Sequence, residues 1–224
     1  GVNPRPAPES GGPAPGRRYG GIDKDERQRQ RRQRLIEAGL AVFGQKGFHA
    51  TTVRNVCHHA ELTSRYFYES FESMEALFEG VYTHVNAELM RRTLAALQGA
   101  PMVPEKLAED ALRAFLTFIQ EDPHRARVVL IDALTVGAGA SRISNESNKD
   151  FARLIASFIE MLYPTLAKDT GINPVLIANG LVGANVRIAT VWVEDKCATP
   201  LEDVLRNLFS FFLAIIHYGE QQLK

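Results

Sequence analysis

The chain has 224 residues, of which 45% are hydrophobic and 23% charged, and its formal net charge at neutral pH is zero. This composition is typical of a soluble globular protein that buries a sizeable core, and it excludes a disulfide-stapled miniprotein. Cys57 and Cys197 have neither zinc-site nor redox-motif spacing, so we expect two reduced thiols in a cytoplasmic protein. No secretory signal or membrane-spanning helix is predicted.

The charge is unevenly distributed along the chain. Residues 17–68 hold 11 basic and 5 acidic side chains, whereas residues 69–224 hold 14 and 20. A basic block before an acidic body is typical of a polyanion-binding module joined to a regulatory or oligomerising domain, although a solvated helix face gives the same charge. Residues 1–21 contain six Gly and five Pro, which predicts a disordered tail.

Apolar residues recur at helical spacing along the rest of the chain, and no strand alternation competes with this pattern. The first helix is predicted over 24–45 and ends at Gly47. Two short helices follow, for which Thr52 and Thr63 are candidate capping residues. A long amphipathic helix is then predicted over 73–98, and further helices are predicted to the end of the chain.

The first three helices form a helix-turn-helix pattern, because the last two are short and are separated by only a few residues. Phe67 and Phe71 lie four residues apart and are predicted to point inward, which leaves polar groups exposed. Arg65 is the best candidate for reading a base, since its guanidinium can donate two hydrogen bonds to guanine, while Tyr68 and Thr52 are placed for phosphates. The predicted DNA-binding residues are Thr51, Thr52, Thr63, Ser64, Arg65, Tyr66 and Tyr68.

Two C-terminal segments suggest an interface between copies of the chain. The segment 201–216 is apolar around more than half of its helical circumference, and 174–193 contains small residues that allow close helix approach. Burial in a larger core would also cover these surfaces, but we favour a two-fold dimer. The predicted interface residues are Leu205, Leu208, Phe209, Phe212, Ile216, Gly180 and Ala184.

Four motifs between Leu35 and Val85 resemble the N-terminal domain of the TetR/AcrR family of transcriptional repressors. They are the helix end at Phe43 to Phe48, then Thr51 to Cys57, Tyr68 to Phe71, and Ser73 to Leu77. Their spacing agrees with the family pattern. The sequence departs from that pattern at Met74, where the family often has a phosphate-contacting Lys, and at Glu61 and Ser70.

The resemblance implies a dimeric repressor that binds a pseudo-palindromic operator and is released by a small apolar or amphipathic molecule. The molecule would enter the C-terminal domain, tilt the long helix and change the separation of the two recognition helices. The candidate pocket residues, although residues of this kind are more often plain core, are Phe115, Phe118, Leu134, Phe158 and Trp192. The predicted fold is all-α, with a tail (1–21), a helix-turn-helix DNA-binding domain (22–72), a connecting helix (73–97) and a ligand-binding and dimerisation domain (98–224).

Other functions receive less support from the sequence. No phosphate-binding glycine motif or nucleophile elbow is present, so neither an enzyme nor a cofactor is expected. No metal is predicted, because the consecutive side chains of Cys57, His58 and His59 diverge on a helix. The arginines over 27–34 form either an exposed helix face or an arm that contacts DNA. The alternative function is an all-helical carrier of lipid or hydrophobic ligand whose basic N-terminus meets a membrane.

Overall fold

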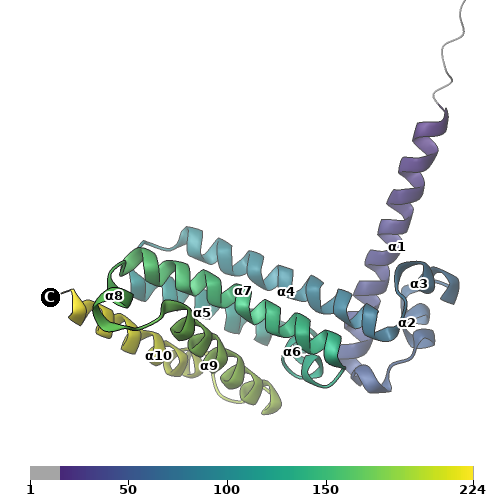
Figure 1. The fold of residues 1–224 in the computed structure, drawn as a ribbon. Helices are drawn as coiled ribbons and strands as arrows, with labels where there is room; N and C mark the ends of the chain where they lie inside the picture. The colour runs from purple at the N-terminus through teal and green to yellow at the C-terminus, as the bar shows by residue number, and fades with distance from the viewer. Residues whose placement is uncertain (1–15, 224) are drawn as a thin grey trace, which may run out of the picture.

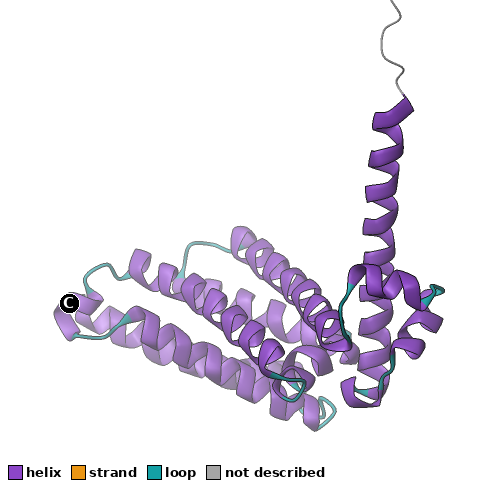
Figure 2. Cartoon of the chain, turned by 45° about the vertical axis from the view of Figure 1, so that its right-hand side comes forward, coloured by secondary structure: helices purple, strands orange, loops and turns teal. Residues whose placement is uncertain are grey.

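The structure is a computed structural model that describes residues 16–223, and within that range it contains helices and no strands (Figures 1 and 2). The predicted all-α fold is therefore confirmed. The helices are α1 (Gly16–Lys46), α2 (Val53–Ala60), α3 (Ser64–Ser70), α4 (Met74–Gly99), α5 (Pro104–Glu121), α6 (Pro123–Leu130), α7 (Ala138–Leu162), α8 (Leu166–Thr170), α9 (Pro174–Glu194) and α10 (Leu201–Gln222), with short 3₁₀ helices η1 (Phe48–Ala50) and η2 (Asp132–Leu134).

Several helix boundaries differ from the sequence predictions. Helix α1 begins at Gly16, inside the segment predicted as a tail, whose residues 1–15 lie outside the described part of the chain. The helical pattern after Pro123 is divided into α6 and η2, and α8 was not predicted because it is only one turn long. Gly137 occupies the N-cap position of α7.

The N-terminal helices pack around a cluster of aromatic rings. Phe43 lies 5.6 Å from Phe48 and 5.5 Å from Phe78, and Phe67 lies 6.1 Å from Phe71, measured between ring centroids. Phe67 is completely buried, so the inward orientation predicted for it is confirmed. This packing fixes the short α3 against α1, since a helix of seven residues has little stability of its own.

Side-chain caps define where two of these helices start. Thr52 forms a capping box with Asn55, in which each side chain accepts a hydrogen bond from the backbone N–H of the other residue. Ser73 accepts a hydrogen bond from the backbone N–H of Ala76 at the start of α4. Thr63 occupies the N-cap position of α3, but its side chain makes no capping hydrogen bond.

Helix α4 belongs to both parts of the molecule. Its first turns pack on α1, and its later turns pack on α5 and α7 in the C-terminal bundle, which extends away from the helix-turn-helix domain (Figure 1). One hydrophobic cluster runs through both parts, from Leu35 in α1 and Phe67 in α3 to Leu208 in α10. The domains are therefore joined by shared core packing as well as by the chain.

The junction between the two parts is tightly fitted on the α6 side. A Cβ atom placed on Gly44 of α1 would collide with the backbone and Cβ of His124 in α6. The backbone N–H of Phe48 donates to the buried carboxylate of Asp132 at 3.3 Å, and Arg127 lies 3.5 Å from the same carboxylate. These contacts hold the end of α1 against α6 and η2.

Candidate nucleic-acid interface and ligand cavity

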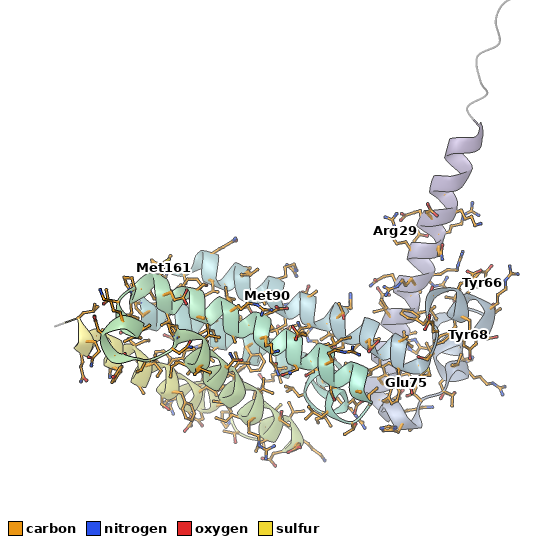
Figure 3. All side chains as sticks on the ribbon, in the orientation of Figure 1. Arg29, Tyr66, Tyr68, Glu75, Met90 and Met161 are labelled. Carbon is orange, nitrogen blue, oxygen red and sulfur yellow. The ribbon has the colours of Figure 1, made fainter. Side chains whose placement is uncertain are left out.

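The outer face of α3 carries the polar groups predicted to contact DNA. Ser64 and Tyr68 are exposed, and the Arg65 side chain is 85% exposed, with its Nε 4.0 Å from Glu69 Oε1. Tyr68 extends from α3 on the side away from the bundle (Figure 3). The ring of Phe67, on the opposite face, anchors the helix. The arrangement presents a guanidinium, a hydroxyl and a phenol on one rigid helix.

The threonines predicted at this site differ in their surroundings. Thr51 is buried and its hydroxyl donates to the carbonyl of Gly47 at 2.8 Å, so in this structure the group stabilises the turn and does not lie on the exposed surface. Thr52 and Thr63 are exposed at the starts of α2 and α3. The Thr52 oxygen already accepts the Asn55 N–H, which leaves its hydroxyl proton for an external acceptor.

The arginines of α1 separate into two groups. Three of them hold α1 to its neighbours: Arg31 lies 4.4 Å over the ring of Tyr66, Arg32 lies over Phe71, and Arg34 donates to a backbone carbonyl in α2. Tyr66 is consequently half-buried at the edge of the exposed surface. Beyond these contacts α1 projects past α3 (Figure 3), and residues 23–30 are all exposed.

One candidate for the interface was missed by the sequence analysis. Arg54 is exposed in the first turn of α2, two residues after Thr52. The available signal was a basic residue in the first helical turn after a capping threonine. His58 and His59 at the other end of α2 are also exposed, whereas Cys57 is buried. Within residues 16–223 no group of three or more His, Cys, Asp or Glu side chains could hold a metal ion.

A cavity of about 210 Å³ lies among α4, α5, α7, α9 and α10 of the bundle. Phe115, Leu134 and Phe158 line it, as predicted for a pocket. Phe118 and Trp192 do not. Phe118 is fully buried beneath the Arg125 guanidinium, which lies 3.8 Å from its ring, and the indole N–H of Trp192 donates to the carbonyl of Thr199 at 2.8 Å, so both are core residues.

Polar groups occur at intervals along the cavity. Near the DNA-binding domain, burial raises the pKa of Tyr82, and hydrogen bonds with Ser144 and Ser147 partly offset that increase. At the opposite end, burial and the nearby carboxylates of Glu220 and Glu105 raise the pKa of Tyr163. Both phenols are therefore protonated at neutral pH. Sequence periodicity did not identify either tyrosine as a cavity residue, because at both positions the pattern of apolar residues predicts only burial in the core.

Some residues predicted for the dimer interface are buried within the protomer, and others are exposed. Leu205, Leu208 and Ile216 are buried within the protomer, and Phe212 lines the cavity, so these four do not form a free surface. Phe209 packs on the same core. Gly180 is exposed and Ala184 is half-exposed on α9. The sequence analysis missed Phe211 and Tyr218, which are 46% and 38% exposed on the outer face of α10.

The two cysteines and the most apolar helix have no evident chemical role. Cys57 and Cys197 are free, and burial raises the pKa of both thiols. Among the described residues, one helix, α9, is long and apolar enough to cross a membrane by length and composition, and 33% of its apolar window is buried inside the protein. Within the bundle α9 packs against α7 and α10.

Comparison with known proteins connects the helix-turn-helix domain to a family. Residues 35–81 match the family model of bacterial regulatory proteins, tetR family. The chain is 29% identical over 85 residues to the transcriptional repressor DhaR of a Mycobacterium species, covering 38% of this chain and 43% of DhaR. It is 24% identical over 204 residues to the transcriptional activator FasR of Mycolicibacterium smegmatis, covering 89% of this chain and 87% of FasR.

The matched regions span less than two thirds of DhaR and of the Bacillus subtilis regulator YdgC, at 43% and 64% of their lengths. Solved structures show the same fold over most of the chain. The fatty acid degradation regulator FadR of Bacillus halodurans has a TM-score of 0.71 at 15% identity, covering 81% of this chain and 94% of that one. FadR of Bacillus subtilis, solved in complex with stearoyl-CoA, has a TM-score of 0.70 at 13% identity, covering 80% and 96%. The family model therefore identifies residues 35–81 as a DNA-binding domain of the tetR type, and the solved structures show that the chain shares the fold of these regulators.

Proposed function

We propose that this regulator is a cytoplasmic dimeric repressor that binds a pseudo-palindromic DNA operator and leaves it when a small apolar or amphipathic molecule occupies the bundle cavity. The observation that carries the proposal is the position of α4. Its N-terminal turns support the DNA-binding domain, and its Tyr82, Asn86, Leu89, Thr93 and Leu97 line the cavity. A ligand that displaces α4 would therefore act directly on the support of α3.

The DNA contacts follow from the exposed chemistry of α2 and α3. Arg65, at the second position of α3, is suited to bidentate hydrogen bonding with guanine in the major groove. Tyr68 of α3, together with Thr52 and Arg54 at the start of α2, is exposed; these three side chains would bind phosphates, which positions α3 without reading the sequence. The exposed turns of α1, including Arg27, would lie along the backbone or the adjacent minor groove.

Dimerisation would use the outer faces of α9 and α10. The exposed apolar side chains Leu176 and Val191 lie on α9, and Phe211 and Tyr218 lie on α10. Gly180 belongs to the same face, where a Cβ atom would meet no atom of the protomer within 4 Å, so a second backbone could approach closely. A two-fold pairing of this face would bury the apolar groups and hold two copies of α3 at a fixed spacing.

The comparison proteins support a regulator with an aliphatic effector, although they differ in the direction of regulation. DhaR is named a repressor and FasR an activator. The Bacillus subtilis FadR structure contains stearoyl-CoA. The mainly apolar lining of the cavity in this chain favours a ligand with a substantial hydrocarbon part.

Selection of bound fragments from random double-stranded DNA would test the DNA-binding role. We expect a pseudo-palindrome, and we expect Arg65→Ala to lose about 1–3 kcal/mol with relaxed preference at one base position in each half-site. Tyr68→Phe is the matched comparison, because loss of a phosphate contact should weaken binding to all sequences equally. Undiminished selectivity in Arg65→Ala would refute the assigned role of Arg65.

Sedimentation would test the dimer and its link to DNA affinity. Phe211→Asp places a charge on the exposed face of α10 and should give monomers with poor operator affinity. Ser210→Asp, at an adjacent exposed position, controls for the added charge. Its effect on the dimer dissociation constant shows how far the interface extends around α10. An intact dimer in Phe211→Asp would exclude this face as the interface.

A further inference from the structure

The cavity in the bundle contains no charged group. Every side chain that lines it, within residues 16–223, is apolar or uncharged, and the polar ones are Tyr82, Asn86, Thr93, Ser144, Asn148, Tyr163 and Asn185. An ionised carboxylate or phosphate moved from water into such surroundings loses several kcal/mol of solvation, on the order reported for unpaired buried ions. The part of a ligand that enters the cavity must therefore be neutral.

Two polar atoms in the lining have no hydrogen-bond partner among the residues that the structure describes. They are the phenolic oxygen of Tyr163 and the side-chain oxygen of Asn185, and both are shielded from solvent. The Thr93 hydroxyl in the same lining, by contrast, donates to the carbonyl of Leu89 at 2.8 Å. A buried polar group without a partner costs about 1–3 kcal/mol, so these atoms mark where a ligand would supply one.

Tyr163 is the stronger of the two groups because its whole residue is only 7% exposed. Burial together with Glu220 and Glu105 raises the pKa of its hydroxyl, so the hydroxyl keeps its proton and can donate it to an oxygen acceptor. The same two carboxylates would repel an anionic group placed beside Tyr163. This end of the cavity thus favours a neutral acceptor on electrostatic grounds as well.

The cavity is long and narrow. Its lining extends along α4 from Tyr82 to Leu97 and along α7 from Ser144 to Tyr163. At 1.5 Å per helical residue these stretches measure roughly 20 to 30 Å. A volume of about 210 Å³ distributed over that length fits an extended, unbranched chain better than a compact ring system.

We propose that this cavity selects a long straight-chain lipid whose polar end is an uncharged oxygen group, such as an alcohol or an ester, that accepts a hydrogen bond from the Tyr163 hydroxyl. A free fatty acid in its ionised form is excluded. A thioester carbonyl belongs to the accepted class when its charged carrier remains outside the cavity. The inference rests on the proposed effector function, since it specifies the ligand of the same site.

Direct binding to the purified full chain, in the absence of DNA, tests this selectivity. The probes are cetyl alcohol, methyl palmitate and sodium palmitate, which share a hydrocarbon length and are delivered from the same cyclodextrin at neutral pH. The alcohol and the ester should bind at least about tenfold more tightly than palmitate, the ratio that 1.4 kcal/mol produces. Equal or tighter binding of palmitate would overturn the proposal, as would failure of all three to bind.

Two variants separate recognition by Tyr163 from its contribution to packing. Tyr163→Phe should weaken binding of cetyl alcohol about tenfold and leave binding of hexadecane unchanged, because only the hydrogen bond is lost. Tyr82→Phe is the matched control, since the Tyr82 hydroxyl is already paired with Ser144 and Ser147. Equal losses for cetyl alcohol and hexadecane in Tyr163→Phe would indicate a packing role and refute the assignment.

The outcomes also distinguish this inference from the regulatory proposal. Selective binding of the neutral lipids without release of operator DNA would leave the assigned ligand class intact and refute the effector role. Release of DNA by palmitate together with tight palmitate binding would support the effector role and refute the selectivity for a neutral end. Circular dichroism of both variants confirms that each retains its helical fold before binding is compared.

Discussion

The helix-turn-helix domain and the C-terminal bundle contain similar helices but are packed differently. In the first, aromatic rings fill the space between the helices. In the second, the helices enclose a cavity of about 210 Å³. A filled core has one well-defined arrangement, whereas a hollow one can accept a ligand or change its packing. The difference indicates which part positions α3 and which part can respond to a ligand.

The largest expected effect comes from removing a ring from the filled core. Phe67→Ala should lower the free energy of unfolding by about 3–5 kcal/mol, because Phe67 is completely buried. Phe158→Ala, a change of the same chemistry at a half-buried cavity position, should cost only about 1 kcal/mol. Urea denaturation measures both. Equal costs would contradict the contrast between a filled and a hollow core.

A second test targets the close contact between the two parts. Gly44→Ala should destabilise the protein by about 1–3 kcal/mol, since its Cβ would overlap the Cβ and backbone of His124. Gly99→Ala, at the end of α4, is the control because nothing lies within 4 Å of the added carbon. Thermal denaturation of both variants gives the comparison. A Gly44→Ala protein as stable as the wild type would mean that α6 can move away from α1 at little cost.

The attachment of α3 to α1 gives a smaller effect. Arg31 lies over the Tyr66 ring and 3.5 Å from Glu69, so Arg31→Ala should reduce stability by about 1 kcal/mol. Arg29→Ala removes the same charge from an exposed position on the other side of α1, where the residue pairs only with Glu26, and should change stability little (Figure 3). Similar unfolding midpoints for the two variants would show that Arg31 does not hold α3.

The smallest effect concerns pH and the surface of α4. Hydrogen bonds from Arg91 and Arg92 lower the pKa of Glu88 from 4.5 to about 2. Because the folded state has the lower pKa, the stabilisation is present above pH 4.5 and is lost as pH falls toward 2. The groups are largely exposed, which limits the contribution to a few tenths of a kcal/mol. Glu88→Gln should therefore melt slightly below wild type at pH 7 and together with it near pH 2; a constant difference across that range would contradict this account.

Local sequence signals predicted the DNA-binding domain well. The Thr52 cap, the four-residue spacing of Phe67 and Phe71, and Gly47 with its φ of 81° are properties of neighbouring residues, and they appear in the structure where the pattern placed them. Thr63 takes its predicted N-cap position but without a capping hydrogen bond. The exposure of Arg65 followed from the same spacing. The sequence did not distinguish Thr51 from Thr52, because both offer the same hydroxyl and only the fold shows which one is buried.

The packing of the C-terminal bundle could not be predicted from local sequence signals. Helix α10 is apolar on several faces, and periodicity does not reveal that Leu208 faces the core, Phe212 the cavity and Phe211 the solvent. Likewise the cavity residues Tyr82 and Tyr163 come from helices far apart in the sequence. Which apolar faces meet, and where they fail to fill space, depends on helix placement that a single sequence does not encode locally.

The fit of α1 against α6 limits how such proteins can be recombined. The backbone N–H of Phe48 donates to Asp132, and Gly44 leaves room for His124. The surface of the helix-turn-helix domain is therefore complementary to the α6 and η2 of this particular bundle. A chimera joined in the middle of α4 would combine α1 from one parent with α6 and η2 from another, and their contact surfaces would not be complementary. A chimera of two such proteins should therefore take α1, α6 and η2 from the same parent, or else the surface of α1 that contacts α6 must be redesigned.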